Sequence, residues 1–277
     1  MTYAAIMTHV RPEPEAAPRL SRAKEIAARF GARLIGVGAE MIPPLAFDNG
    51  FYSVDAEWVT AMRESIEGQF KVCRDVFRLE TADLPAGRAV WLCGIDSPTP
   101  AIAAASRAAD LIVVGGAPRK GTSPYRDVSP AELAIQAGRP VLVAPPTAPD
   151  LSASRIVIAW KDTREARRAL SDSLPFLLKA KGVLVFEVCE HDAVSDAEVR
   201  TGDVADALQR RGVAAEAKVE VQGHGPPSRR ILDAARAFEA DLIVLGCYGH
   251  SRLGEWVFGG VTRDLLDQDE AYLLLSH

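Results

Sequence analysis

The stretch ADLIVVG at residues 109–115 decides the fold of this chain, because it returns as ADLIVLG at residues 240–246. The two copies are 131 residues apart, and PVLV at 140–143 aligns with AYLL at 271–274 at the same separation. Self-similarity at one constant separation indicates that a structural unit is repeated. We therefore expect the 277 residues to hold two copies of one fold.

The beginnings of the two copies also correspond, but at a larger separation. AAIMTHV at residues 4–10 resembles IVIAWKD at residues 156–162, 152 positions on. The first copy is therefore expected to be 21 residues longer. Residues 41–58 are the expected place of the insertion, because they contain a Pro-Pro pair and an Asn-Gly pair, which favour turns. The sequence assigns no role to this insertion.

A proline-rich linker separates the copies. Residues 145–152 read PPTAPDLS, which cannot continue a central strand. The expected domains are residues 1–147 and residues 153–277. The length agrees, since a domain of about 150 residues is the usual prior.

Short apolar runs rich in β-branched residues predict the strands of the second copy. They lie at residues 156–159, 183–188, 217–221, 242–245 and 272–275. The first copy repeats this order. Near-continuous apolar strands that alternate with helices are typical of parallel sheets covered on both faces. Right-handed crossovers then give a doubly wound α/β unit.

Helices are expected between these strands. Asp162 and Glu165 have the spacing of a capping box at the start of the first helix, and Gly182 suits its end. Residues 204–211 are expected in the next helix, and Pro226-Pro227 opens a third. One apolar face of the first helix comprises Ala166, Leu170, Leu174 and Leu177.

Charge and hydropathy exclude several classes of partner. The net charge is −5, with 16 basic and 16 acidic residues up to Thr147 and 16 basic and 21 acidic residues after it. No basic stripe is present, so we expect no nucleic-acid binding. No apolar run reaches the length of a membrane span, and residues 1–12 do not resemble a signal peptide, so a cytoplasmic protein is expected.

Two stretches could carry chemistry, because ligands of such sheets bind at the carboxyl ends of the strands, at the switch point of strand order. One is WKDT at residues 160–163, and the other is GCYGHSRLGEWVFGGVT at residues 246–262. Successive glycine amides can form an anion-binding nest, and a helix that starts near Gly260 would add its N–H groups. Thr262 could add a hydroxyl. A flexible loop without a ligand is the alternative.

On these residues the sequence resembles the universal stress protein family. Gly246, Gly249 and Gly259 match the Gly-x2-Gly-x9-Gly nucleotide motif of that family. The resemblance covers the whole chain and implies two tandem, doubly wound, parallel five-stranded domains of the adenine nucleotide alpha hydrolase-like fold. It also implies that the two last strands pair, residues 141–144 beside residues 272–275, in an internal pseudo-dimer.

The resemblance further implies an adenine nucleotide site in the second copy. ATP is the expected ligand, with Mg²⁺ only as its counter-ion, and no intrinsic metal is expected. Two positions depart from the family pattern: Gly260 stands where the motif has Ser or Thr, and Lys161 stands at the acidic position after the first strand. The nucleotide-binding residues expected are Ala159, Trp160, Lys161, Asp162, Val188, Gly246, Gly249, His250, Arg252, Gly259, Gly260, Val261 and Thr262.

The first copy lacks this motif. GGAPRKG at residues 115–121 has Pro118 in the place of the second glycine. Gly116, Arg119 and Lys120 could hold an anion, and a solvated basic turn is the alternative. We interpret the first copy as structural or regulatory.

Other functions remain as alternatives. No Gly-x-Ser-x-Gly elbow and no Walker lysine–hydroxyl pair is present, so no catalytic residue is expected. A weak ATPase would use Lys161, Asp162 and His250. A nucleotide-independent interaction or chaperone-like module is the second alternative, and a homodimer of the whole chain is compatible with either.

Cysteine usage argues against disulfide bonds and metal. The four cysteines contain no CxxC pair and are expected as small buried hydrophobes. Cys189, His191, Cys247 and His250 all follow strands and are ligand types for zinc. The strand order implied by the resemblance separates them.

Overall fold

The computed structural model describes most of the chain. The described residues are 2–12, 16–44, 56–116, 123, 125–146, 150–247 and 260–277.

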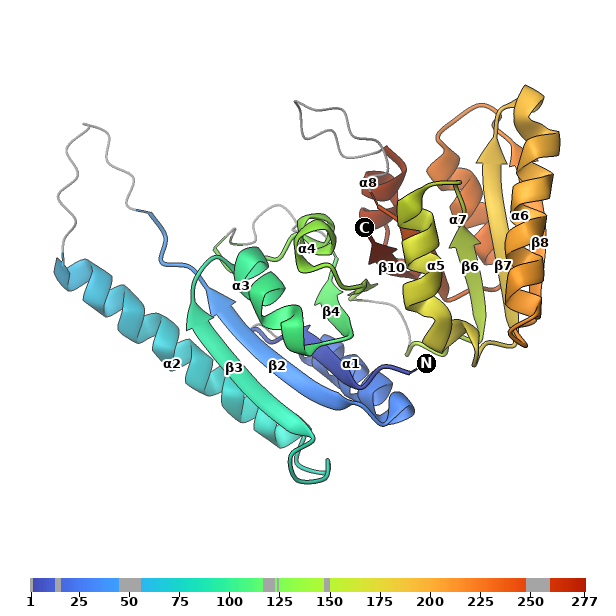
Figure 1. Cartoon of the computed structure of the whole chain (residues 1–277). Coiled ribbons are helices and arrows are strands. Elements are labelled where there is room, and N and C mark those ends of the chain that lie inside the picture. Colours follow the sequence, from blue (N-terminus) through green and yellow to red (C-terminus); the bar gives the residue numbers. More distant parts are fainter. Residues whose placement is uncertain are drawn as a thin grey trace, which may run out of the picture.

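One ten-stranded sheet forms the centre of the molecule (Figure 1). Its order is β3-β2-β1-β4-β5-β10-β9-β6-β7-β8, so each half of the chain contributes five adjacent strands. The strands are β1 (Ala5–His9), β2 (Arg33–Glu40), β3 (Ala89–Ile95), β4 (Leu111–Gly115), β5 (Val141–Ala144), β6 (Arg155–Ala159), β7 (Gly182–Cys189), β8 (Ala215–Val221), β9 (Leu242–Gly246) and β10 (Tyr272–Ser276).

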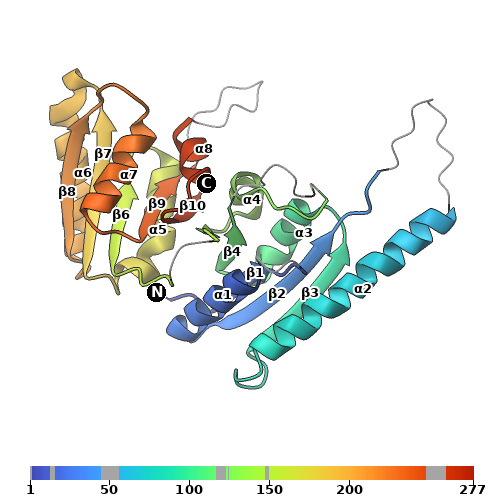
Figure 2. The ribbon, with the colours of Figure 1, turned by 180° about the vertical axis from the view of Figure 1, so that it is seen from behind.

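Helices cover both faces of the sheet, as the two opposite views show (Figures 1 and 2). One buried cluster joins the sheet to α1 (Ala16–Phe30), α2 (Ala56–Glu80), α5 (Arg164–Leu177) and α6 (Val194–Gln209). The other joins it to α3 (Pro98–Ala105), α4 (Pro130–Ala137), α7 (Pro227–Ala237) and α8 (Gly260–Leu266). The expected doubly wound fold with parallel strands is confirmed in both halves.

The last strands of the two halves pair antiparallel, which confirms the expected internal pseudo-dimer. Leu142 of β5 lies opposite Leu274 of β10, and Val143 and Val141 lie opposite Leu273 and Leu275. The neighbouring pairs are all parallel. This pairing is the arrangement that a twofold axis generates at a self-complementary interface.

The strand register corrects the expected alignment of the two copies. Ile6 and Ile156 pair with Leu111 and Leu242, so the first strands correspond at a separation of 150 residues, not 152. Ile112 and Ile243 are equivalent residues of the repeated stretch, 131 residues apart. Ile112 pairs with Val141, whereas Ile243 pairs with Leu273. The last strands therefore correspond at 132 residues, not 131. An alignment based on sequence alone can be wrong by one or two positions within an apolar run, because neighbouring positions carry the same residue types.

The extra length of the first half is not confined to residues 41–58, as the sequence analysis expected. α2 has 25 residues and its counterpart α6 has 16, so much of the surplus is helix. Phe70, Cys73 and Phe77 bury one face of α2 beyond the expected insertion. The part of the insertion at 45–55 lies outside the described residues.

The start of α5 differs from the expected capping box. Thr163 is the N-cap, with its hydroxyl oxygen accepting a hydrogen bond from the amide of Ala166 at 3.3 Å. Asp162 instead forms an ion pair with Arg167. Gly182 does not end this helix, which stops at Leu177; it begins β7, where a side chain would meet the ring of Phe238.

The aspartate of the repeated ADLIV stretch has the same structural role in both halves. Asp110 accepts hydrogen bonds from the amides of Ala4 and Ala5 at 2.8 and 3.0 Å. Asp241 accepts from the amides of Ser152 and Ala153 at 2.8 and 2.9 Å. Each carboxylate therefore fixes the entry to the first strand of its half, far from the carboxyl ends of the strands.

An aromatic cluster joins the halves beside this end of the sheet. The ring centroids of Tyr3, Phe30 and Phe176 lie 5.0 to 5.6 Å apart in edge-to-face pairs. The Tyr3 hydroxyl donates to the carbonyl oxygen of Asp172 at 2.7 Å. Burial raises the pKa of Tyr3 above its ordinary value, and the charges of Asp172 and Asp110 add to this effect. The phenol therefore stays neutral as a donor.

Candidate nucleotide-binding site

The candidate site lies at the switch point of the second half. From β6 the chain proceeds to β7 and β8 on one side, and it returns to β9 and β10 on the other. α5 follows β6 on one face of the sheet, and α8 precedes β10 on the opposite face. The carboxyl ends of β6 and β9 thus meet where ligands of doubly wound sheets bind.

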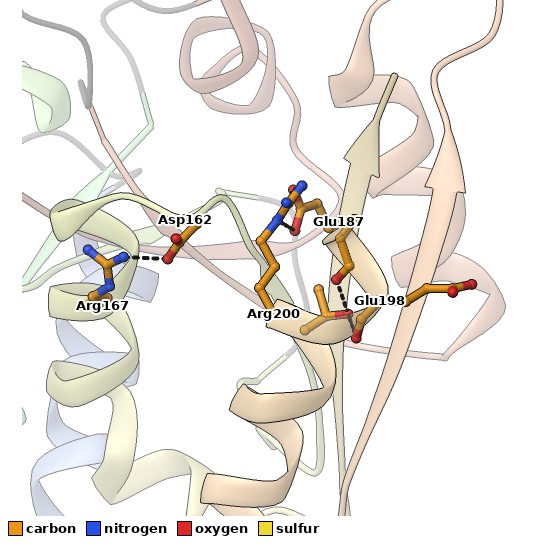
Figure 3. A network of polar contacts seen from close by, with 7 residues as sticks. Asp162, Arg167, Glu187, Glu198 and Arg200 are labelled. Carbon is orange, nitrogen blue, oxygen red and sulfur yellow. Dashed lines mark hydrogen bonds and ion pairs between the residues drawn. The ribbon is translucent and has the colours of Figure 1, made fainter. Parts of the chain in front are cut away.

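The residues after β6 divide between the core and solvent. Trp160 is 6% exposed and its amide donates to the carbonyl of Phe186 at 2.8 Å. Within the described part of the chain, its buried indole N–H has no hydrogen-bond partner. Lys161 and Asp162 are exposed, and Asp162 is turned toward Arg167 of α5 (Figure 3). Trp160 therefore packs into the core at the end of β6, and Lys161 is an exposed cation beside it.

Gly246 ends β9 against the first turn of α5. A β-carbon at this position would lie 2.4 Å from the backbone nitrogen of Ala166, a distance that real contacts do not reach. Glycine is thus required for the packing of α5, whatever the ligand. The next residue, Cys247, is buried, and burial raises the pKa of its thiol to about 12. This thiol is therefore not a nucleophile at neutral pH.

The remaining residues expected at the site are only partly described. Gly260 is exposed at the start of α8, Val261 is half-buried and Thr262 is buried. Ala159 lies at the end of β6 opposite Leu245, and Val188 packs on the sheet face that α7 and α8 cover. Gly249, His250, Arg252 and Gly259 lie outside the described residues.

Sequence reasoning missed an ion pair at the carboxyl end of β7. Arg200 of α6 donates hydrogen bonds of 2.7 to 3.0 Å to both carboxylate oxygens of Glu187 (Figure 3). Glu187 is 5% exposed, and its carboxylate raises the pKa of Arg200. The signal was a single glutamate in the apolar run VLVFEV, because a buried charge needs a partner.

In the first half, charged side chains of its own occupy the carboxyl ends of β1 and β2. Arg126 pairs with Glu40 at 2.7 Å, and Arg11 pairs with Asp127 at 2.5 Å. His9 is buried, and burial together with the charges of Arg19 and Arg11 lowers its pKa to about 3. The imidazole is therefore neutral at physiological pH.

Little space remains between these groups. A cavity of about 10 Å³ is lined by His9, Arg11, Glu40, Gln69 and Arg126, among others. That volume holds about one water molecule. Among the described residues of the first half, this cavity is too small for a nucleotide.

Register identifies the residues that occupy the same positions in the second half. Ala159 of β6 corresponds to His9 of β1, and Cys189 of β7 corresponds to Glu40 of β2. Two bulky polar groups of the first half are thus replaced by small residues. The second half therefore lacks these two side chains, but it carries Trp160 and the Glu187–Arg200 pair where the first half has Val10 and Gly38.

A cluster of metal ligands and a membrane-spanning helix are both missing from the described ranges. They contain no group of three or more His, Cys, Asp or Glu side chains that could hold a metal ion. β6 lies between β7 and β9, so Cys189, which ends β7, and Cys247, which follows β9, belong to strands that are not neighbours. No helix within the same ranges is long and apolar enough to cross a membrane.

The ten-stranded sheet, with five adjacent strands from each half, defines a tandem, doubly wound α/β protein. Residues 152–268 match the model of the Universal stress protein family. The second half of the chain therefore belongs to that family, and the whole chain has its tandem fold.

Solved structures resemble the chain over its whole length. A universal stress protein from Archaeoglobus fulgidus DSM 4304 is 15% identical with a TM-score of 0.66, over 98% of this chain and 95% of that chain. A putative universal stress protein from Pseudomonas aeruginosa UCBPP-PA14 is 18% identical with a TM-score of 0.61, over 99% and 93%. No curated protein matches the chain. At these identities the structures show the fold alone.

Proposed function

We propose that the second half binds an adenine nucleotide, ATP, at the carboxyl ends of β6 and β9. The domains are residues 1–147 and 153–277, and only the second holds the ligand. The protein acts as a cytoplasmic stress-response protein that uses the nucleotide as a ligand or switch, not as a rapidly consumed substrate.

The difference between the two halves is the observation that carries this proposal. In the first half, His9, Glu40 and their arginine partners fill the edge. In the second, Ala159 and Cys189 stand at the corresponding positions, and the glycine motif follows β9. The two copies of one fold thus differ at these two positions, and Ala159 and Cys189 belong to the copy that carries the motif.

The proposal assigns roles within the site. Ala159, Trp160 and Val188 form walls around the base and sugar, while backbone amides from Gly249, Gly259 and Gly260 bind phosphate. Lys161 offsets phosphate charge in place of the acidic residue of the family pattern. Mg²⁺ enters only with the nucleotide. A local cation matters here, because the residues after Thr147 carry the whole net charge of −5.

Isothermal titration with ATP and Mg²⁺ tests the proposal directly. Lys161→Glu should weaken binding at least about tenfold, because it brings a like charge to the phosphates. Lys181→Glu is the matched control, because Lys181 is also exposed and the substitution makes the same change of charge. Lys181 directly precedes β7, so it lies at the amino ends of the strands, away from the proposed site. Absence of binding by the folded wild-type protein at millimolar ATP would refute the proposal.

A nucleotide-independent interaction module is the second candidate function. Gly260 removes a hydroxyl from the motif, and Asp162 is paired with Arg167. Capture of one partner from stressed cells, equal in yield with and without ATP, would favour this candidate. A partner whose yield changes with ATP would support the nucleotide switch.

A further inference from the structure

The two edges of the ten-stranded sheet are built on the same fold but have opposite chemistry. β3 and β8 are the edge strands of the sheet, and each pairs on one side with the second strand of its half. Leu34 pairs with Ala89 as Val183 pairs with Ala215, so the two strands can be compared residue by residue. Any difference between them is a difference of side chains at equal positions.

β8 carries charges on the side of the sheet where β3 is apolar. Glu216, Lys218 and Glu220 occupy the positions that Val90, Leu92 and Gly94 occupy in β3. Charged side chains, lysine above all, are the usual protection of an edge strand against pairing. β8 is therefore a protected edge.

β3 has no such protection. Its sequence, AVWLCGI, contains no charged residue and no proline over seven positions. Leu92 at its centre is 41% exposed, and Cys93 and Gly94 are exposed as well. A long, uncharged, apolar edge is the form that pairs with another strand.

We propose that β3 is the surface through which a second copy of this chain binds. The two β3 strands pair antiparallel, with Leu92 opposite Leu92, and the sheet continues from one copy into the other. This interface is additional to the β5–β10 pairing within the chain, and it does not depend on nucleotide binding.

Side-chain complementarity identifies the occupant as a second copy. Pairing about the centre of β3 places Val90 opposite Gly94 and Trp91 opposite Cys93, without any like charges. The same pairing of β8 would place Lys218 opposite Lys218 and Glu216 opposite Glu220, which is repulsive.

The molecule already contains this mode of association. β5 and β10 are uncharged strands of like units that pair antiparallel, with Leu142 opposite its counterpart Leu274. A twofold pairing of β3 repeats that geometry at the outer edge of the first half.

Sedimentation of the full chain over a concentration series tests the interface. The wild-type protein should be a dimer, and the double variant V90E/L92K, which copies the residues of β8, should dissociate at least about tenfold more readily. Val221→Lys is the matched control, because Val221 is 40% exposed on the opposite edge; it should leave the dimer intact. A monomeric wild-type protein, or a double variant that dimerises normally with a native circular dichroism spectrum, would overturn the proposal.

Cys93 offers a second, independent measurement. It is exposed, whereas Cys73, Cys189 and Cys247 are buried. Across the proposed interface the two Cys93 residues are diagonal neighbours, about 7–8 Å apart. A short bismaleimide should link two copies, and Cys93→Ser should abolish the link. A dimer by sedimentation that this reagent does not link would assign the interface to another surface.

Discussion

Replacement of Phe176 by alanine should strongly destabilise the protein, because this ring joins the two halves. Phe176 lies on α5 of the second half and is fully buried. Its ring centroid is 5.1 Å from that of Phe30 and 5.6 Å from that of Tyr3, both in the first half. The guanidinium of Arg29 lies 5.9 Å from the same centroid.

The magnitude follows from burial and from the ring pairs. Truncation of a fully buried phenylalanine costs about 3–5 kcal/mol through lost transfer free energy and the remaining cavity. Leu178→Ala, two positions on in the chain, is the control, because Leu178 is 45% exposed and should cost less than about 1 kcal/mol. The free energy of unfolding is measured by urea denaturation, followed by circular dichroism.

A double-mutant cycle separates the contact between the halves from simple loss of a side chain. Phe30→Ala and Phe176→Ala should show a coupling free energy of about 0.5–1.5 kcal/mol, the usual value for an edge-to-face pair. Additive effects, or a cost of Phe176→Ala below about 1 kcal/mol, would refute the assignment of this cluster as a joint between the halves.

Three further predictions concern packing, pH and the pairing of the halves. Gly246→Ala should lower the free energy of unfolding by about 1–3 kcal/mol in thermal unfolding, because its β-carbon would meet the backbone of α5. Gly115→Ala is the control and should lower it less, because its β-carbon would meet only the movable guanidinium of Arg19. His9 has a pKa of about 3 in the folded protein, below its ordinary value of 6.5. Its contribution to the free energy of unfolding is therefore complete above pH 6.5 and decreases as the pH falls toward 3, by at most about 1.4 kcal/mol per pH unit. His9→Gln should flatten this part of the dependence of urea midpoints on pH; an unchanged slope would contradict it. Residues 153–277 expressed alone should form a homodimer or aggregate in sedimentation, since β10 loses its partner β5, and a stable monomer would count against the pairing.

The sequence predicted the topology well because its signals are strong and local. Apolar runs such as 183–188 and 242–245 became β7 and β9, and the repeat of ADLIV placed two copies of one unit. Helix α7 begins at Pro227, as the Pro-Pro pair predicts. These features depend on hydrophobic periodicity and on turn residues, which are visible without tertiary contacts.

The errors arise where several neighbouring residues satisfy the same local rule. Asp162 and Thr163 are both good N-caps, and only the tertiary path of the chain selects Thr163. The closed edge of the first half was also missed, because Arg126 and Glu40 are 86 residues apart and no periodicity joins them. For Gly246, the motif suggested a ligand, whereas the contact that requires glycine is with the backbone of α5.

The number of nucleotides bound per chain tests the central claim most directly. Native mass spectrometry of the folded protein with ATP and Mg²⁺ should show one nucleotide per chain. Ala159→His, which gives the second half the residue that fills the first, should abolish binding without loss of fold. No bound nucleotide, two per chain, or one that survives Ala159→His would contradict the account.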